Sequence, residues 1–250
     1  MATSNPAFSQ DMFAGYDQVY GQPRSMVTTV QGTMSKTFLL LAILSGAGLW
    51  AYHSMGAGQL AQPVVGVSAI AGFILAMVTI FKPTISPWTA PVYAAMQGVF
   101  LGALSQIVQL RFPQVPGIAL QAVSLTVGTL LVMLFLYTSG IVKVTERLKA
   151  GIMMATGAVC LFYLASIVLR MFGVSVPLIF SATPAGFAFS LFVCGLAAFN
   201  LLLDFDFIEE ASRREAPKYM EWYGAFGLIV TLVWLYLELL RLLQKMNSRN

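Results

Sequence analysis

The sequence is short of charged side chains. Only 10% of its 250 residues are Asp, Glu, Lys or Arg, and 58% are hydrophobic. Soluble globular domains carry about 25% charged residues, so this composition excludes an ordinary water-soluble domain. A membrane helix takes about 20 residues, and seven such helices would use most of the chain. No room remains for a separate catalytic domain in water.

Histidine and cysteine are also scarce. His53 is the single histidine and cannot by itself form a His-based metal site. Cys160 and Cys194 lie within apolar runs, where a thiol behaves as a small hydrophobe rather than as a disulfide partner. The sequence therefore predicts no cofactor and no resident metal. Lys and Arg lie between the apolar runs rather than on one face, so we expect no nucleic-acid partner.

The apolar runs lack the period-two alternation of barrel strands and are about twice a strand's length, so we interpret them as helices. We expect the lipid bilayer as partner and an all-α integral membrane fold, a seven-transmembrane-helix bundle. Residues 1–35 are polar and lack the basic start and apolar core of a signal peptide, so we expect a flexible N-terminal tail before a membrane domain at 36–250. Small residues such as Gly98 and Gly102 predict close helix packing. The expected spans are residues 37–52, 64–81, 90–110, 117–137, 150–169, 184–208 and 222–243.

The distribution of cations predicts the orientation in the membrane. With seven spans, nine Lys and Arg residues lie on the side of the N-terminus and five on the other side. The positive-inside rule then places the N-terminus in the cytoplasm. A re-entrant last helix would strengthen this bias, so six spans plus a re-entrant seventh remain open, as does the side of the C-terminus.

Ionisable residues inside membrane segments are costly and are functional candidates by default. Asp204 and Asp206 lie near the end of the sixth run, Glu221 opens the seventh, and Glu238 lies deep within it. Asp206 points about 160° away from Asp204 on a helix, so at most one of them faces the interior squarely. We favour Asp204, because Asn200, four residues before it, continues its face inward and could line a polar path. Asp206 is expected to meet cations of the 209–218 loop.

Two carboxylates close together can share a proton, and loss of that proton creates both repulsion and oxygen ligands for Ca²⁺. This is a physical route from two acids to a pH-gated cation path. Glu221 is nearer than Glu238 in depth to Asp204, since Glu238 lies roughly 30 Å along the helix from the preceding turn. Glu238 could instead form an ion pair with Arg241 three residues on. Gln97 lies on one face with Ser105 and could line a polar path or form interhelical hydrogen bonds.

Several stretches resemble the Bax inhibitor-1 family, also called the transmembrane Bax-inhibitor-motif family, in its bacterial branch. They are residues 5–8, 36–40, 91–105, 200–209, 216–223 and 235–240. The resemblance implies a seven-helix fold with helix seven central, in the bacterial inner membrane. It also implies a pH-dependent Ca²⁺ leak gated by acids on helices six and seven, which match Asp204 and Glu238. Leaky relatives hold a latch cation on helix two, whereas here Lys82 follows that run.

Three functions compete at this level. The first is the proton-sensitive Ca²⁺ leak. The second is a non-conducting membrane interaction protein that modulates a membrane protease or a stress response, with the N-terminal tail as a handle for a membrane protein partner. The third is an intramembrane enzyme, which we exclude: an aspartyl type needs two interior Asp residues at one level, and a metal type needs more than one histidine.

Overall fold

The structure is a computed structural model that describes residues 27–173 and 183–248. Within these residues, seven helices are long and apolar enough to cross a membrane, which confirms the all-α membrane fold. Residues 1–26 of the expected tail lie outside the described residues. The helices are α1 (Val30–Gly56), α2 (Pro63–Phe81), α3 (Ser86–Arg111, after the 3₁₀ turn η3 at Pro83–Ile85), α4 (Ile118–Thr138), α5 (Glu146–Met171), α7 (Pro184–Arg213) and α8 (Met220–Asn247).

The helix ends follow from local sequence. Thr29 precedes α1 and its side chain accepts a hydrogen bond from the Gly32 amide at 3.0 Å, and Thr145 caps α5 in the same way. Such caps satisfy amides that have no partner inside the helix. Gly117 takes a φ of 73° just before α4, a conformation that suits glycine. Between such ends the apolar chain satisfies its backbone internally, as lipid requires.

The last helix favours one of the two alternatives that the sequence left open, seven full spans. Helix α8 runs without interruption for 28 residues, whereas a re-entrant segment would need a break. It is also the most buried of the described spans: 61% of the residues in its most apolar 18-residue stretch are buried, against 17% in α2 and in α5. That helix seven is central stays a prediction.

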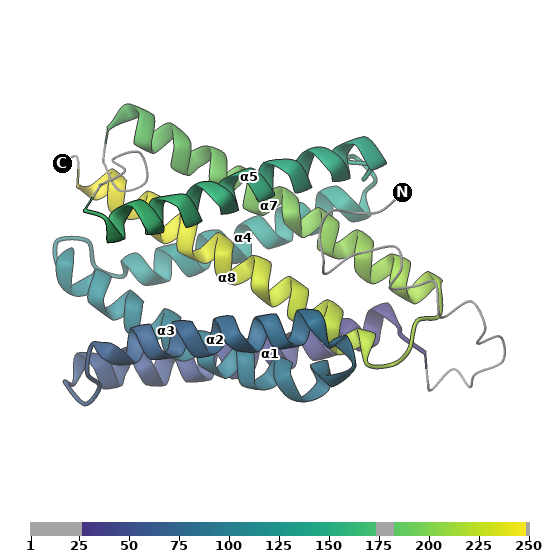
Figure 1. Cartoon of the computed structure of the whole chain (residues 1–250), viewed down its shortest axis with the longest axis horizontal. Coiled ribbons are helices and arrows are strands. Elements are labelled where there is room, and N and C mark those ends of the chain that lie inside the picture. Colours follow the sequence, from purple (N-terminus) through teal and green to yellow (C-terminus); the bar gives the residue numbers. More distant parts are fainter. Residues whose placement is uncertain (1–26, 174–182, 249–250) are drawn as a thin grey trace. The chain divides into compact units, whose positions relative to one another are not determined.

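Two compact units divide the described chain. The first unit comprises residues 27–110 and 204–233, and the second comprises residues 111–203 and 234–248, so α7 and α8 each contribute to both. In the first unit α1 and α3 lie side by side (Figure 1). A Cβ added at Gly102 would lie 2.0 Å from the Gly48 carbonyl oxygen, and one at Gly98 would lie 2.3 Å from that of Leu44. The expected close packing through small residues is therefore confirmed.

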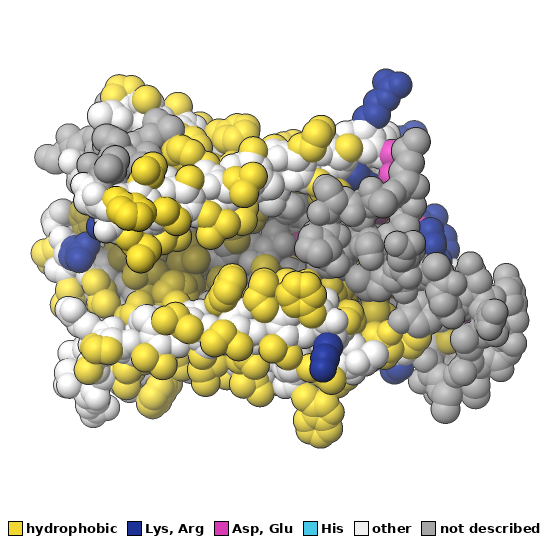
Figure 2. All heavy atoms as spheres, viewed as in Figure 1, with side chains coloured by type: hydrophobic (Ala, Val, Ile, Leu, Met, Phe, Trp, Pro, Cys, Tyr) yellow, Lys and Arg dark blue, Asp and Glu magenta, His cyan; other side chains and the backbone are white. Residues whose placement is uncertain are grey.

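Large apolar side chains cover the outside of the helices. Phe38, Phe73, Leu131 and Leu161 are each at least 60% exposed. Hydrophobic side chains extend along the visible helices in Figure 2, with few Lys or Arg side chains among them. Exposed apolar surface on this scale is typical of contact with lipid rather than with water.

Candidate functional site

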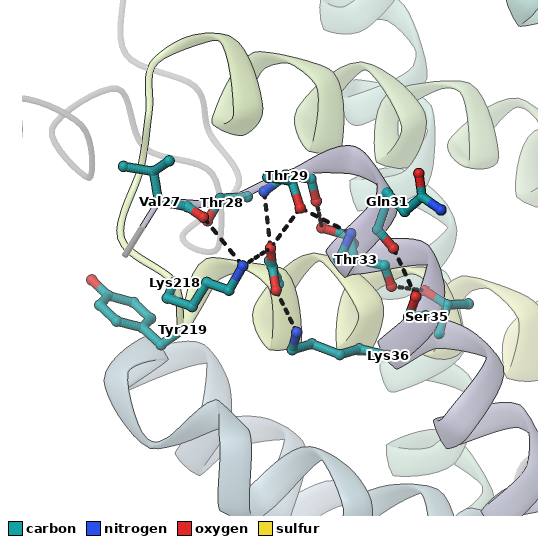
Figure 3. Close-up of polar contacts among 12 residues, drawn as sticks. Val27, Thr28, Thr29, Gln31, Thr33, Ser35, Lys36, Lys218 and Tyr219 are labelled. Atoms are coloured by element: carbon teal, nitrogen blue, oxygen red, sulfur yellow. Dashed lines mark hydrogen bonds and ion pairs between the residues drawn. The ribbon is translucent and has the colours of Figure 1, made fainter. Parts of the chain in front are cut away.

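Glu221, in the first turn of α8, is fully buried and holds four hydrogen-bond donors. Its Oε1 accepts from the amide and the hydroxyl of Thr29, both at 2.9 Å, and from Lys218 Nζ at 2.8 Å. Its Oε2 accepts from Lys36 Nζ. Figure 3 shows Thr29, Lys36 and Lys218 converging on this carboxylate. A Cβ at Gly32 would overlap the carboxylate at 2.0 Å, so a larger residue there would force the Glu221 side chain out of this network.

Backbone contacts extend this network to the turn between α7 and α8. The Thr28 amide donates to the Ala216 carbonyl at 2.7 Å, and the Thr28 hydroxyl donates to that of Pro217 at 2.7 Å. Lys218 also reaches the Val27 carbonyl at 3.4 Å. The segment before α1 is thus fastened to the start of α8. Glu221 holds two cations in a structural network.

Asp204 lies in α7 and is only 6% exposed. The Thr231 side chain of α8 forms a hydrogen bond with its carboxyl group, but Oδ2 has no hydrogen-bond partner among the described residues. A Cβ at Gly227 would lie 3.9 Å from Oδ1, so the backbone of α8 passes close to this carboxyl group. Among residues 27–173 and 183–248, no Lys or Arg forms an ion pair with Asp204. Within the described part of the chain, Asp204 is therefore a buried acid without a countercharge.

The structure does not bring Glu221 and Asp204 together as an acid pair. Thr231, the partner of Asp204, lies ten residues after Glu221 on the same helix, which corresponds to about 15 Å. The carboxylate of Glu221 also faces lysines rather than a second acid. Glu221 pairs instead with Lys36, which is distant in sequence and therefore could not be placed beside it from the sequence.

Glu238 is 1% exposed and belongs to the second unit. Arg241 Nη1 lies 2.8 Å from its Oε2 and 2.9 Å from its Oε1, and the Tyr163 hydroxyl donates to Oε1 at 3.0 Å. The guanidinium group also lies over the Tyr163 ring, 5.2 Å from its centroid. The ion pair with Arg241 is thus confirmed, and an acid pair of Glu238 with Asp204 stays a prediction.

The other predicted site residues lie in separate places. Gln97 of α3 forms a side-chain hydrogen bond with Tyr93, while its Oε1 is buried without a partner among the described residues. Asn200 donates to the Thr156 hydroxyl of α5 and to the Leu196 carbonyl, both at 2.9 Å. Asp206 is half-buried on α7. Asn200 therefore joins two helices of the second unit, and the path-lining roles of Asn200 and Gln97 stay predictions.

The comparisons with known proteins now decide the family. A model of proteins described as Bax inhibitor 1 like matches residues 5–248. The chain belongs to the Bax inhibitor 1 like family. The search of curated proteins found no match, and neither did the search of solved structures.

One buried cation of this Bax inhibitor 1 like protein was missed by sequence reasoning. Lys245 is one of the five cations counted on the side opposite the N-terminus, yet it is 3% exposed and donates to the Gly186 carbonyl and the Ser190 hydroxyl, both at 2.8 Å. Its spacing from Glu238 and Arg241 carries the signal, since residues at i, i+3 and i+7 share a helix face. In the described residues, no group of three or more His, Cys, Asp and Glu side chains is placed to hold a metal.

Proposed function

We propose that this protein is a pH-sensitive cation leak with Ca²⁺ as the transported ion, and that the proton on Asp204 controls it. The observation that carries the proposal is the state of Asp204: a carboxyl group buried in a spanning helix, with one oxygen lacking a partner and no paired cation among the described residues. Membership of the Bax inhibitor 1 like family supports a multi-spanning bundle as its setting.

The chemistry follows from the cost of a buried charge. An unpaired carboxylate in an apolar interior is strongly unfavourable, so the closed packing fits the protonated acid. When the proton leaves, the charge must gain water or a cation, and α7 must shift against α8 to admit them. The ionised oxygens are then hard ligands of the kind that Ca²⁺ prefers. Protonation at Asp204 thus closes the leak, and deprotonation opens it.

The two buried glutamates, Glu221 and Glu238, are less suited to this role. Glu221 forms ion pairs with Lys36 and Lys218, and Glu238 forms one with Arg241, so each of these acids already has a positive partner. In this proposal Asp204 is therefore the group whose protonation controls the leak. The family resemblance implies a pair of acids, whereas here we propose that one acid is sufficient.

We also propose the bacterial inner membrane as the location, with the N-terminus in the cytoplasm. The support is the excess of Lys and Arg on the N-terminal side, nine against five, and the family resemblance. With α8 crossing the membrane as a seventh span, the C-terminus lies outside.

Asp204→Asn should abolish the pH response of Ca²⁺ flux. Asparagine is close in size to the protonated acid and cannot ionise, so flux at neutral pH should fall to the low level of acid pH. The measurement is Ca²⁺ entry into dye-loaded liposomes that contain the purified protein, at acid and at neutral pH. Asp206→Asn, the same change two residues away at a half-buried position, serves as the control and should keep the response.

Two results would overturn the proposal. One is flux by Asp204→Asn that equals the wild type at both pH values. The other is the absence of flux in the wild type, which would leave a non-conducting membrane interaction protein as the function.

A further inference from the structure

An apolar groove of about 250 Å³ lies between α5 and α7 within the second unit. Its lining comprises Arg147, Leu148, Gly151, Ile152 and Ala155 of α5 with Leu196 and Phe199 of α7. Pockets for drug-sized ligands are about 300–1,000 Å³, so this groove is better matched to a thin flexible chain than to a bulky substrate.

Arg147 places a positive charge at one end of the groove. It lies in the first turn of α5, where the helix leaves the membrane surface, and Ala155 lies about 12 Å deeper along the helix. The side chain of Arg147 is exposed and has no hydrogen-bond or ion-pair partner in the described part of the chain, and the same holds for the side chain of Lys143 four residues earlier. The nearby acid Glu146 already forms an ion pair with Lys149, whose Nζ lies 3.1 Å from the Glu146 Oε1. Among the described residues, Arg147 therefore brings one unpaired cation to the end of the groove, and Lys143 offers a second one four positions earlier in the sequence.

The deep end of the groove is fixed by a polar contact. Asn200 donates to the Thr156 hydroxyl at 2.9 Å, and these residues directly follow Phe199 and Ala155, which line the groove. This bond holds α5 and α7 together at that level. The groove thus has a charged mouth, an apolar wall and a fixed inner end.

We propose that this groove binds one acyl chain of an anionic phospholipid, whose phosphate group is held by Arg147 and Lys143. A phosphate group complements two unpaired cations, and the orientation in depth is that of a lipid, with the head group at the surface and the tail inside. Basic sites beside membrane helices are known to select anionic head groups. The proposal does not depend on ion conduction.

Substitutions at two glycines of α5 test binding of the tail, and substitutions at the two cations test binding of the head group. Gly151 lines the groove, and a Cβ added there would meet no heavy atom within 4 Å, so Gly151→Leu is expected to fill part of the groove. Gly157 is equally open but does not line the groove, which makes Gly157→Leu the matched control. Arg147→Gln and Lys143→Gln remove the charges and leave the groove.

The test uses the purified full chain in detergent with added dioleoyl phosphatidylglycerol or dioleoyl phosphatidylcholine, which share the same tails. Bound lipid is counted by native mass spectrometry, and the unfolding temperature is measured in parallel. We expect the wild type to prefer phosphatidylglycerol and each charge removal to weaken it about fivefold, the factor that corresponds to about 1 kcal/mol per surface cation. Gly151→Leu should lower retention of both lipids, Gly157→Leu should not, and inorganic phosphate should not raise the unfolding temperature.

Equal retention of the two lipids by the wild type would overturn the assignment of the head group. Equal retention by Gly151→Leu and Gly157→Leu would overturn the assignment of the tail. Stabilisation by inorganic phosphate alone would show an anion site without a lipid, and would also contradict the proposal. Unfolding temperatures without added lipid show whether each variant is folded.

Discussion

Glu221→Ala is expected to lower the free energy of unfolding by about 3 kcal/mol, the lower end of the range for breaking a buried ion pair. The carboxylate is fully buried and accepts from Thr29, Lys36 and Lys218, so its loss leaves several donors without an acceptor. The lower end applies because the lysines keep some access to water, with 19% and 46% of their side chains exposed. The measurement is denaturant unfolding in detergent, followed by circular dichroism.

A matched control for Glu221→Ala is Glu146→Ala. Glu146 also pairs with a lysine three residues away, but 81% of its side chain is exposed. A surface pair of this kind contributes about 0–1 kcal/mol, so its loss should be barely detectable. Gly32→Ala, which would place a Cβ against the Glu221 carboxylate, should reproduce much of the Glu221→Ala effect. Similar losses for Glu221→Ala and Glu146→Ala would contradict the structural role of the network.

Gly102→Ala should destabilise the protein by about 1–3 kcal/mol, the usual cost of forcing extra atoms into a packed contact. The added methyl group would lie 2.0 Å from the Gly48 carbonyl oxygen, and backbone cannot turn aside as a flexible side chain can. Helices α1 and α3 would have to separate. The shift in the unfolding midpoint measures this cost.

The control for Gly102→Ala is Gly128→Ala in α4, where a Cβ would meet nothing within 4 Å. Alanine is favoured over glycine in helices by up to about 1 kcal/mol, so this variant should be neutral or slightly more stable. If Gly102→Ala and Gly128→Ala shifted the midpoint alike, the close contact between α1 and α3 would be refuted.

The spans were predictable because lipid requires long apolar runs, but the helix ends were not. Hydropathy detects contact with hydrocarbon, whereas a helix continues into the interface wherever its backbone is satisfied. Helix α1 therefore begins at Val30, seven residues before the expected start of its span, with Thr29 as its cap. Helix α5 begins at Glu146 rather than at residue 150, because Thr145 caps it.

Polar contacts could be predicted from the sequence only where the two partners lie close together in the chain. The pairs Glu238–Arg241 and Lys218–Glu221 have the i, i+3 spacing of one helical turn and were open to prediction. The contact of Glu221 with Lys36 joins positions 185 apart, and only the packing of α1 against α8 in the first unit creates it. The acids could be found from the sequence because charge is rare in a spanning helix, but their partners depend on tertiary packing.

Infrared spectroscopy of the protein in lipid bilayers tests the central claim most directly, because a protonated carboxyl group has its own C=O stretching band. The wild type should show a buried carboxyl band at acid pH that disappears as the pH rises to neutral. Asp204→Asn should lack this band, and Asp206→Asn should retain it. A spectrum of Asp204→Asn that matches the wild type across this range would show that Asp204 does not exchange a proton, and would contradict the account.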